Sequence, residues 1–439
     1  MLNRTVTRLS VQSLVSSPFI SLSHSQFCTL FQGIRSTNML GTFLYSSYIP
    51  HSLIVEKSYF SHSLARSIHI NSIIFTDQTF FTRISMEEQP PILIVSSLFY
   101  HITHLGSNGG ALQINVKDSS KNSVVLNDNG FISCSTDHDG GAGVITAPKV
   151  SLNGNCFDSC KSGQSSMSIQ LSMAIKDAVT FINNTNVHKC APTILSGSQY
   201  SFCANFGMLS INQFNSSRNC IAGLYGFMGI VTEDELHMKY ALAYQCNSNI
   251  LLLFIGSPEC TFYISDLMFI NNTNRGETII DNTMGTFEYY NCIFLDNIQY
   301  KSNDIIISIQ FYGNLTVSNC FSDKNLSGRI SYNAKYFFIN NQVVNENYPT
   351  FSLSYIDSAK CWKNYVMESP KLYEIIALKW GTTIYRSALV VGICLAAIIG
   401  KRIYHYGDGI RAQRLEFSEI EALSHTTNQF SYEYDFEVL

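Results

Sequence analysis

The chain has 439 residues, a formal net charge of −4 and a sequence pI near 6.3. This balance argues against nucleic-acid binding, because proteins that bind nucleic acids carry clustered positive charge. Hydrophobic residues make up 46% of the chain and charged residues only 14%, well below the usual quarter or so. An ordinary soluble enzyme of this size needs a more charged surface, and no phosphate loop or dinucleotide-binding motif indicates a cofactor.

The first fifty residues are rich in Ser and Thr and contain no clear apolar signal segment. Their structure is undetermined from the sequence. From about residue 51 short strand-like runs begin, as in Ser52–Val55, with Val, Ile, Phe, Tyr and Thr prominent. We expect residues 51–360 to form one β-structured domain outside the cell.

A repeat dominates this domain. Phe followed three residues later by Asn or Cys recurs with steps of 26 (157 − 131), 24 (181 − 157) and 25 (294 − 269) residues. A period of this size is typical of a solenoid or an array, and roughly 25 residues suffice for three short strands and their turns. The repeat predicts an all-β fold, a right-handed parallel β-helix of the pectin-lyase-like kind. Its copies begin at Phe131, Phe157, Phe181, Phe269, Phe294 and Phe338, with weaker ones at Phe99, Phe214 and Phe321.

Stacked coils place equivalent residues above one another, so Phe131, Phe157 and Phe181 should form an internal aromatic stack. The Asn or Cys three residues later should form a ladder at a turn, where Asn tolerates left-handed backbone angles. Two copies of Gly-Gly-Ala, Gly109–Ala111 and Gly140–Ala142, should supply positive φ at a sharp turn and a small inward side chain.

The combination of Phe-x-x-Asn with Gly-Gly-Ala resembles the repeats of polymorphic outer-membrane proteins, a family of surface β-helices. The resemblance covers roughly Phe99 to Asn341 and implies the fold and display at a surface. The chain departs from that pattern in having only two Gly-Gly-Ala copies and no sign of the family's C-terminal outer-membrane β-barrel. The resemblance therefore does not extend to the family's secretion mechanism. A leucine-rich repeat, suggested by Val150–Asn155, is a weaker alternative because the rest of that consensus is missing.

Two of the 13 cysteines, Cys134 and Cys160, occupy the same repeat position in neighbouring coils. Stacking would bring their Cα atoms to about 4.8 Å, within the range of a disulfide. A ladder of buried thiols is the favoured interpretation, and a disulfide between these two is the next. Zinc bound by Cys134, His138, Cys156 and Cys160 is the weakest, because no Cys-x-x-Cys pair supports it, and we predict no metal site.

Asn-x-Ser/Thr sequons fall in predicted turns of the repeat, as expected of an exported glycoprotein. The predicted glycosylation sites are Asn183, Asn215, Asn271, Asn314 and Asn325.

The best acidic cluster is Asp137-His138-Asp139, directly before Gly140. Many β-helices cleave polysaccharides with clustered carboxylates, so Asp137 and Asp139 are the weak catalytic candidates. The favoured interpretation is a polar turn that carries no chemistry.

One apolar run near the C-terminus predicts a single transmembrane helix at 382–400, preceded by a juxtamembrane segment at 361–381. A helix buried in a globular domain is the alternative. Lys401 and Arg402 follow at once, which places the tail 401–439 in the cytoplasm. Small residues every fourth position give one face on which two such helices could associate: Ala388, Gly392, Ala396 and Gly400.

These features predict a single-pass plasma-membrane protein whose extracellular β-helix mediates adhesion by binding a glycan or a surface protein. The alternative is a membrane-tethered polysaccharide lyase or hydrolase that uses the acids near Asp137 and Asp139. A coat protein without a specific ligand is a third, weaker hypothesis.

Overall fold

The computed structural model describes residues 4–344 except 14, 16, 23–27, 48–51, 72–91, 117–122, 173–177, 191–198, 206, 222–224, 277, 301–304, 325, 327 and 331–332. These described residues form strands, turns and loops, with no helix among them. They all belong to one compact unit, residues 1–367. The predicted juxtamembrane segment, transmembrane helix and tail lie outside the described residues.

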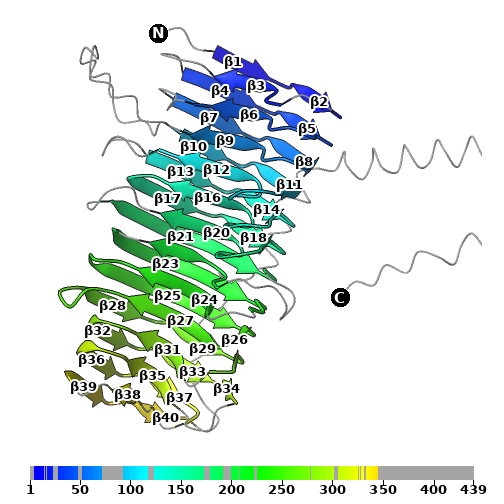
Figure 1. Ribbon diagram of the computed structural model, residues 1–439. Helices are drawn as coiled ribbons and strands as arrows, with labels where there is room; N and C mark the ends of the chain where they lie inside the picture. Colours follow the sequence, from blue (N-terminus) through cyan, green and yellow to red (C-terminus); the bar gives the residue numbers. More distant parts are fainter. Residues whose placement is uncertain are drawn as a thin grey trace, which may run out of the picture. The chain divides into compact units, whose positions relative to one another are not determined.

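The described chain winds into a right-handed parallel β-solenoid, as the repeat predicted. Each turn contributes strands to three faces, and each strand pairs in parallel with its equivalents in the turns before and after it (Figure 1). The solenoid begins earlier than the repeat indicated, because the first fifty residues, which had no predicted structure, already carry strands of all three faces.

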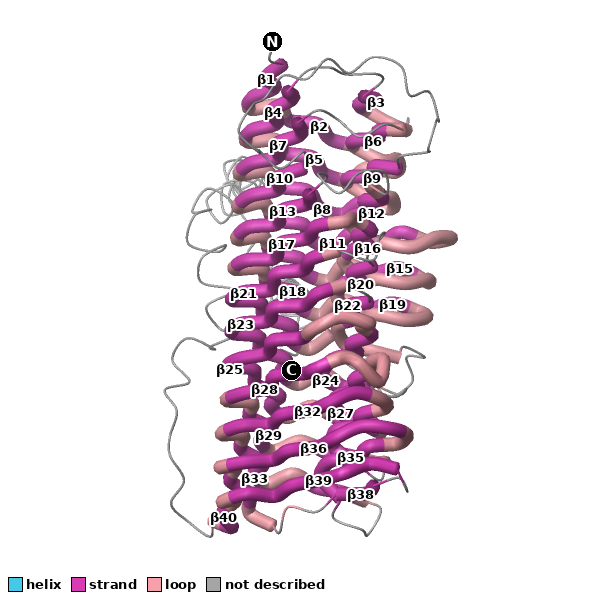
Figure 2. Tube along the Cα trace, turned by 90° about the vertical axis from the view of Figure 1, so that its left-hand side faces the viewer, coloured by secondary structure: helices cyan, strands magenta, loops and turns pink. Residues whose placement is uncertain are grey.

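The first face carries the longest strands, and Figure 2 shows them stacked in a column. Its strands are β1 (Arg4–Thr7), β4 (Cys28–Gln32), β7 (Ser52–Glu56), β10 (Ile92–Val95), β13 (Ser123–Asn127), β17 (Lys149–Asn153), β21 (Val179–His188), β23 (Met208–Ser217), β25 (Leu236–Tyr244), β28 (Thr261–Ser265), β32 (Gly285–Tyr290), β36 (Tyr312–Ser318) and β39 (Asn333–Ile339).

The second face follows after a sharp bend, and β21, β23 and β25 continue across that bend into it. Its other strands are β2 (Ser10–Gln12), β5 (Arg35–Thr37), β8 (Tyr59–Ser63), β11 (Leu98–His104), β14 (Gly130–Ile132), β18 (Cys156–Asp158), β29 (Met268–Ile270), β33 (Ile293–Leu295), β37 (Phe321–Ser322) and β40 (Gln342–Val343). Short strands extend some turns beyond it: β15 (Ser135–Thr136), β19 (Lys161–Ser162), β26 (Asn247–Ser248), β30 (Thr273–Asn274) and β34 (Ile298–Gln299).

The third face is a continuous 12-stranded parallel sheet that closes each turn. It consists of β3 (Ile20–Leu22), β6 (Leu44–Ser46), β9 (Ile68–Asn71), β12 (Leu112–Asn115), β16 (Gly143–Thr146), β20 (Ile169–Ser172), β22 (Cys203–Asn205), β24 (Tyr225–Val231), β27 (Ile250–Ile255), β31 (Thr278–Asn282), β35 (Ile305–Ile309) and β38 (Gly328–Ile330).

Left-handed residues make the bends on either side of the second face. In one turn they are Asp128 (φ 52) and Ser133 (φ 53), and in the next Gly154 (φ 66) and Ser159 (φ 54). Each pair is five positions apart, so the short strand between the bends can point only a few side chains inward. Asn, Asp and Gly tolerate such angles, which explains why polar residues interrupt the apolar runs of the sequence.

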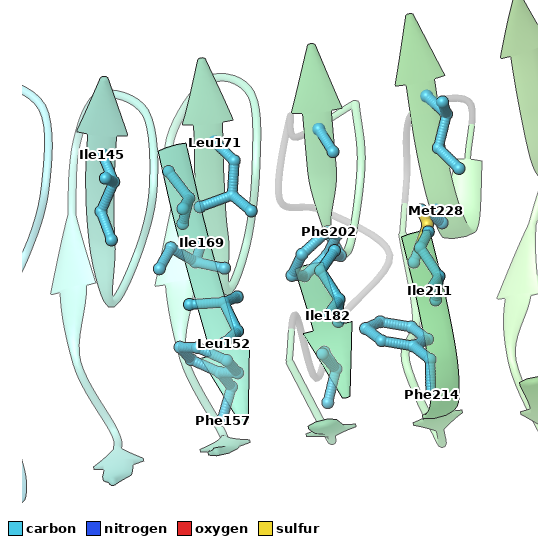
Figure 3. Close-up of a cluster of buried hydrophobic side chains, with 14 of the residues drawn as sticks. Ile145, Leu152, Phe157, Ile169, Leu171, Ile182, Phe202, Ile211, Phe214 and Met228 are labelled. Carbon is cyan, nitrogen blue, oxygen red and sulfur yellow. The ribbon is translucent and has the colours of Figure 1, made fainter. Parts of the chain in front are cut away.

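The predicted aromatic stack exists in part. The ring centroids of Phe99 and Phe131 are 4.8 Å apart and those of Phe131 and Phe157 are 5.0 Å apart, and all three rings are buried. Figure 3 shows Phe157 inside the solenoid, near Leu152 of the same turn. The prediction for Phe181 is wrong, because Phe157 pairs with Val187 in the next turn, and Phe181 lies on the outer side of the first face with 41% of its surface exposed.

In the middle turns small side chains occupy the place of the stacked rings. Val187, Ser216 and Ala243 follow one another there before the stack resumes with Phe269. The space is filled by rings from neighbouring positions: Phe214 contacts Phe227 with centroids 5.5 Å apart, and Phe227 contacts Phe269 at 5.6 Å. The core of the middle turns therefore stays closely packed although the stacked Phe position holds no ring there.

The predicted ladder of Asn and Cys exists in part. Asn184 is instead a left-handed residue of the bend (φ 49), and Asn341 accepts a hydrogen bond from Cys320 N–H and donates one to the Val317 carbonyl at the other bend.

Where the ladder forms, its hydrogen bonds explain why Asn and Cys both occur in it. Cys160 Sγ donates to the carbonyl of Phe131 at 3.4 Å, and at the equivalent place Asn272 Nδ2 donates to Ala243 at 2.9 Å and Asn297 Nδ2 to Phe269 at 2.8 Å. The expected reason was wrong, however. The left-handed residue is the one before the ladder position, for example Asn271 (φ 54), so the ladder selects a buried side-chain donor.

Gly-Gly-Ala behaves as predicted. Gly109 (φ 79) and Gly140 (φ 70) have positive φ, and Ala111 and Ala142 are fully buried. The second glycine is needed for close stacking: a Cβ on Gly141 would lie 2.1 Å from the carbonyl oxygen of Met167 in the next turn.

Candidate ligand-binding face

The outer side of the first face carries a line of exposed aromatic rings. Parallel pairing places one outward residue of each turn directly above another, so residues far apart in sequence form one column. The column runs through Phe181, Ser210, His237, Tyr263, Glu288, Thr316 and Phe337. We call its four aromatic members and the neighbouring Tyr290 the aromatic strip: Phe181, His237, Tyr263, Tyr290 and Phe337.

The rings of the aromatic strip are exposed to solvent, and two of them stack on each other. Tyr263 is 39% exposed, and Tyr290 and Phe337 are each 53% exposed. The imidazole of His237 stacks on Tyr263 with centroids 5.0 Å apart and an interplanar angle of 11°. His237 Nε2 also lies 3.2 Å from Glu235 Oε1, at the base of the neighbouring loop. Exposed apolar surface gathered on one face marks an interaction site more often than scattered apolar residues do.

Polar groups flank the strip on the same face. The amides of Asn153, Asn183 and Asn212 form a ladder between turns. Asn183 Nδ2 donates to Asn153 Oδ1 at 3.0 Å, and Asn212 Nδ2 donates to Asn183 Oδ1 at 3.1 Å. The same column continues through Lys239, whose ammonium lies 4.6 Å from the centroid of the Tyr240 ring. Flat ring faces beside amide, carboxylate and ammonium groups can stack on an extended ligand and hydrogen-bond to its hydroxyls.

The acids singled out in the sequence hold loops together. Asp137 Oδ1 accepts a hydrogen bond from the backbone N–H of Gly106 at 2.7 Å, and Asp139 Oδ1 accepts one from Ser165 N–H at 3.0 Å. Each carboxylate thus joins its loop to the loop of a neighbouring turn. The bond from Gly106 lowers the pKa of Asp137, which is opposite to what a general acid requires at neutral pH.

An acid, a histidine and a serine that are far apart in sequence lie side by side in the solenoid. Asp158, His188 and Ser217 occupy equivalent positions in successive turns, and His188 Nδ1 lies 2.9 Å from Ser217 Oγ. Burial lowers the pKa of His188. The Ser217 hydroxyl is buried, and Asp158 Oδ1 accepts a hydrogen bond from Ser159 Oγ at 2.7 Å. The line is therefore a polar ladder between turns, with a nucleophile that is closed to solvent.

The cysteines at the repeat position form the expected column of thiols. Cys134, Cys160 and Cys190 are buried and free, and burial is the main cause that raises the pKa of Cys134 and Cys190. A disulfide between Cys134 and Cys160 stays a prediction. Cys156 is disulfide-bonded.

The described turns contain no group of three or more His, Cys, Asp or Glu residues that could hold a metal ion. The zinc ligands considered from the sequence, Cys134, His138, Cys156 and Cys160, therefore form no such group. The same turns contain no helix that is long and apolar enough to cross a membrane.

The predicted glycosylation sites differ in accessibility. Asn271 and Asn314 are exposed, and Asn183 is half-buried within the amide ladder. Asn215 is buried, so a glycan there would have to displace its packed surroundings. Asn325 lies outside the described residues. Glycosylation at these positions stays a prediction.

Sequence spacing could not have revealed the aromatic strip, because its members belong to no common motif. Comparison with known proteins found no matching family model, no matching curated protein and no matching solved structure.

Proposed function

We propose that this chain is a single-pass surface protein whose β-solenoid faces the outside of the cell and binds a glycan or a surface protein through the aromatic strip. The observation that carries the proposal is the continuous outward column from Phe181 to Phe337, with rings at several of its turns and the amide ladder beside it. The likeness of the repeats to those of polymorphic outer-membrane proteins supports surface display.

In this proposal residues 382–400 cross the plasma membrane, and Lys401 and Arg402 hold the tail on the cytoplasmic side. The face formed by Ala388, Gly392, Ala396 and Gly400 lets two spans associate. Pairing would present two strips side by side and raise the avidity for a repetitive ligand.

Attachment of cells that display the full-length chain tests the role of the strip. Replacing Tyr263 and Phe337 together with alanine is expected to lower attachment at least tenfold, because it removes two exposed rings from the column and stacked rings contribute strongly to binding. Both side chains lie on the surface, so folding and display should change little.

Tyr300→Ala is the matched control. Tyr300 is 71% exposed but follows β34, away from the first face, and its loss should leave attachment unchanged. Equal attachment by the wild type and the double variant, at equal surface levels, would exclude the strip as the binding site.

A further inference from the structure

An arginine is buried at the corner between the second and third faces, and no described acidic residue forms an ion pair with it. Arg66, on the turn from β8 to β9, is only 5% exposed. Its Nε donates to the carbonyl of Asn108 at 2.9 Å, its Nη1 lies 3.3 Å from His69 Nδ1, and its Nη2 donates to Ser107 Oγ. In the described part of the chain the ion pairs are Lys57–Glu56, His138–Asp137 and His237–Glu235, and none of them involves Arg66.

The neighbouring histidines do not neutralise this charge. Burial lowers the pKa of Arg66 to about 10, so the guanidinium stays charged at neutral pH. Burial and then the Arg66 charge lower the pKa values of His69 and His104 to about 4, so both imidazoles are neutral. Buried charges in proteins are normally paired, and among the described residues no carboxylate forms an ion pair with Arg66.

Hydrogen-bond donors beside Arg66 are also left over. Ser107 Oγ accepts from Arg66 and lies 3.0 Å from His104 Nε2, so its own hydrogen can point to that nitrogen. His104 then carries its proton on Nδ1, which is buried and has no partner among the described residues. The guanidinium has five N–H groups, and the three contacts given above use one at each nitrogen.

The cluster lies close to the surface. His104, Ser107 and Asn108 are half-buried, and Leu105 and Gly106 between them are exposed. The adjoining loops after β15 and β19 project from the solenoid (Figure 2). Asp137 stands at the rim, where its carboxylate is anchored to Gly106 N–H and lies 4.0 Å from His138 Nε2.

We propose that the corner formed by Arg66, His69, His104 and Ser107 binds a tetrahedral oxyanion, a sulfate or phosphate group. Such a group supplies a negative charge and accepts bonds from the spare guanidinium N–H groups and from His104 Nδ1. The site is separate from the aromatic strip, and the proposal does not rest on the function proposed above.

Thermal unfolding of the full-length protein in millimolar sodium sulfate tests this site, with sodium chloride at the same ionic strength as reference. A bound ion raises the midpoint along a saturating curve, whereas general salt exclusion raises it gradually without saturation. We expect a saturating rise for the wild type and for Arg218→Gln, an exposed arginine hydrogen-bonded to Gln245. Asp137→Asn should reach saturation at a lower sulfate concentration, because it removes the negative charge at the rim.

Arg66→Gln should lose the saturating component, and Arg66→Lys should keep part of it because the charge remains. If Arg66→Gln weakens the fold, the sulfate dependence of Arg66→Lys and Asp137→Asn still tests the proposed site. Repeating the titration with inorganic phosphate and with a sulfated disaccharide distinguishes a site for the free ion from one for a sulfated sugar. A wild-type midpoint that rises only without saturation, or an equal saturating rise in Arg66→Gln, would overturn the proposal.

Discussion

Replacing Phe131 with alanine is expected to lower the free energy of unfolding by about 3–5 kcal/mol, the usual range for a buried Phe. The ring is fully buried and lies between Phe99 at 4.8 Å and Phe157 at 5.0 Å, so its loss opens a cavity in the stack. The solenoid cannot easily collapse into that cavity, because parallel pairing fixes the spacing between turns. Urea denaturation followed by circular dichroism measures the change.

Phe181→Ala provides the matched control, since Phe181 belongs to the same sequence motif but lies outside the core with 41% of its surface exposed. Its replacement should cost less than about 1 kcal/mol, as surface substitutions usually do. Equal losses for the two variants would mean that the turn around Phe181 is placed wrongly.

Replacing Asn219 with leucine is expected to cost about 2–6 kcal/mol. Asn219 Nδ2 donates to the carbonyl of Val187 at 3.1 Å and to Ser216 Oγ at 2.7 Å, and its Oδ1 accepts from Cys190 N–H at 2.7 Å. Leucine of similar size leaves the Val187 carbonyl and the Cys190 N–H buried without partners. Each orphaned group costs about 1–3 kcal/mol.

Cys160→Asn is the complementary test in the same ladder. An amide at this position can donate to the Phe131 carbonyl as the Cys160 thiol now does, so no buried carbonyl loses its donor, and we expect a clearly smaller loss than for Asn219→Leu. A loss as large as that of Asn219→Leu would show that Asn and Cys are not interchangeable in the ladder.

The repeat predicted the solenoid because its physical causes are local. A buried ring, a ladder donor three residues later and a left-handed residue between them all lie within one short bend, as in Phe131-Ile132-Ser133-Cys134. Gly-Gly-Ala was equally informative, because the positive φ of its first glycine and the close approach at its second both restrict the residue type.

Phe181 was misplaced because the turns differ in length. The step from Phe157 to its true partner Val187 is 30 residues (187 − 157), whereas the preceding step was 26 (157 − 131). The motif at Phe181 fits the expected period better, yet it lies on the first face, before the left-handed bend at Asn184. Pairing along the whole strand decides the alignment, and a short motif does not contain that information.

The aromatic strip and the Arg66 corner could not be predicted from the sequence, for a different reason. Phe181, Tyr263 and Phe337 come together only because irregular turns stack in register. Arg66 and His104 likewise lie in neighbouring turns and are far apart in sequence, and both contact Ser107. Both sites depend on non-local pairing, whereas the acids at Asp137 and Asp139 attracted attention by being adjacent in sequence.

We propose that the solenoid faces the outside of the cell. The most direct test is the electrophoretic mobility of full-length protein tagged after Leu439, before and after N-glycan removal, together with protease treatment of intact cells. We expect a shift on glycan removal, from exposed sites such as Asn271 and Asn314, and cleavage of the solenoid from outside. An unchanged mobility together with full protection from protease would contradict the claim.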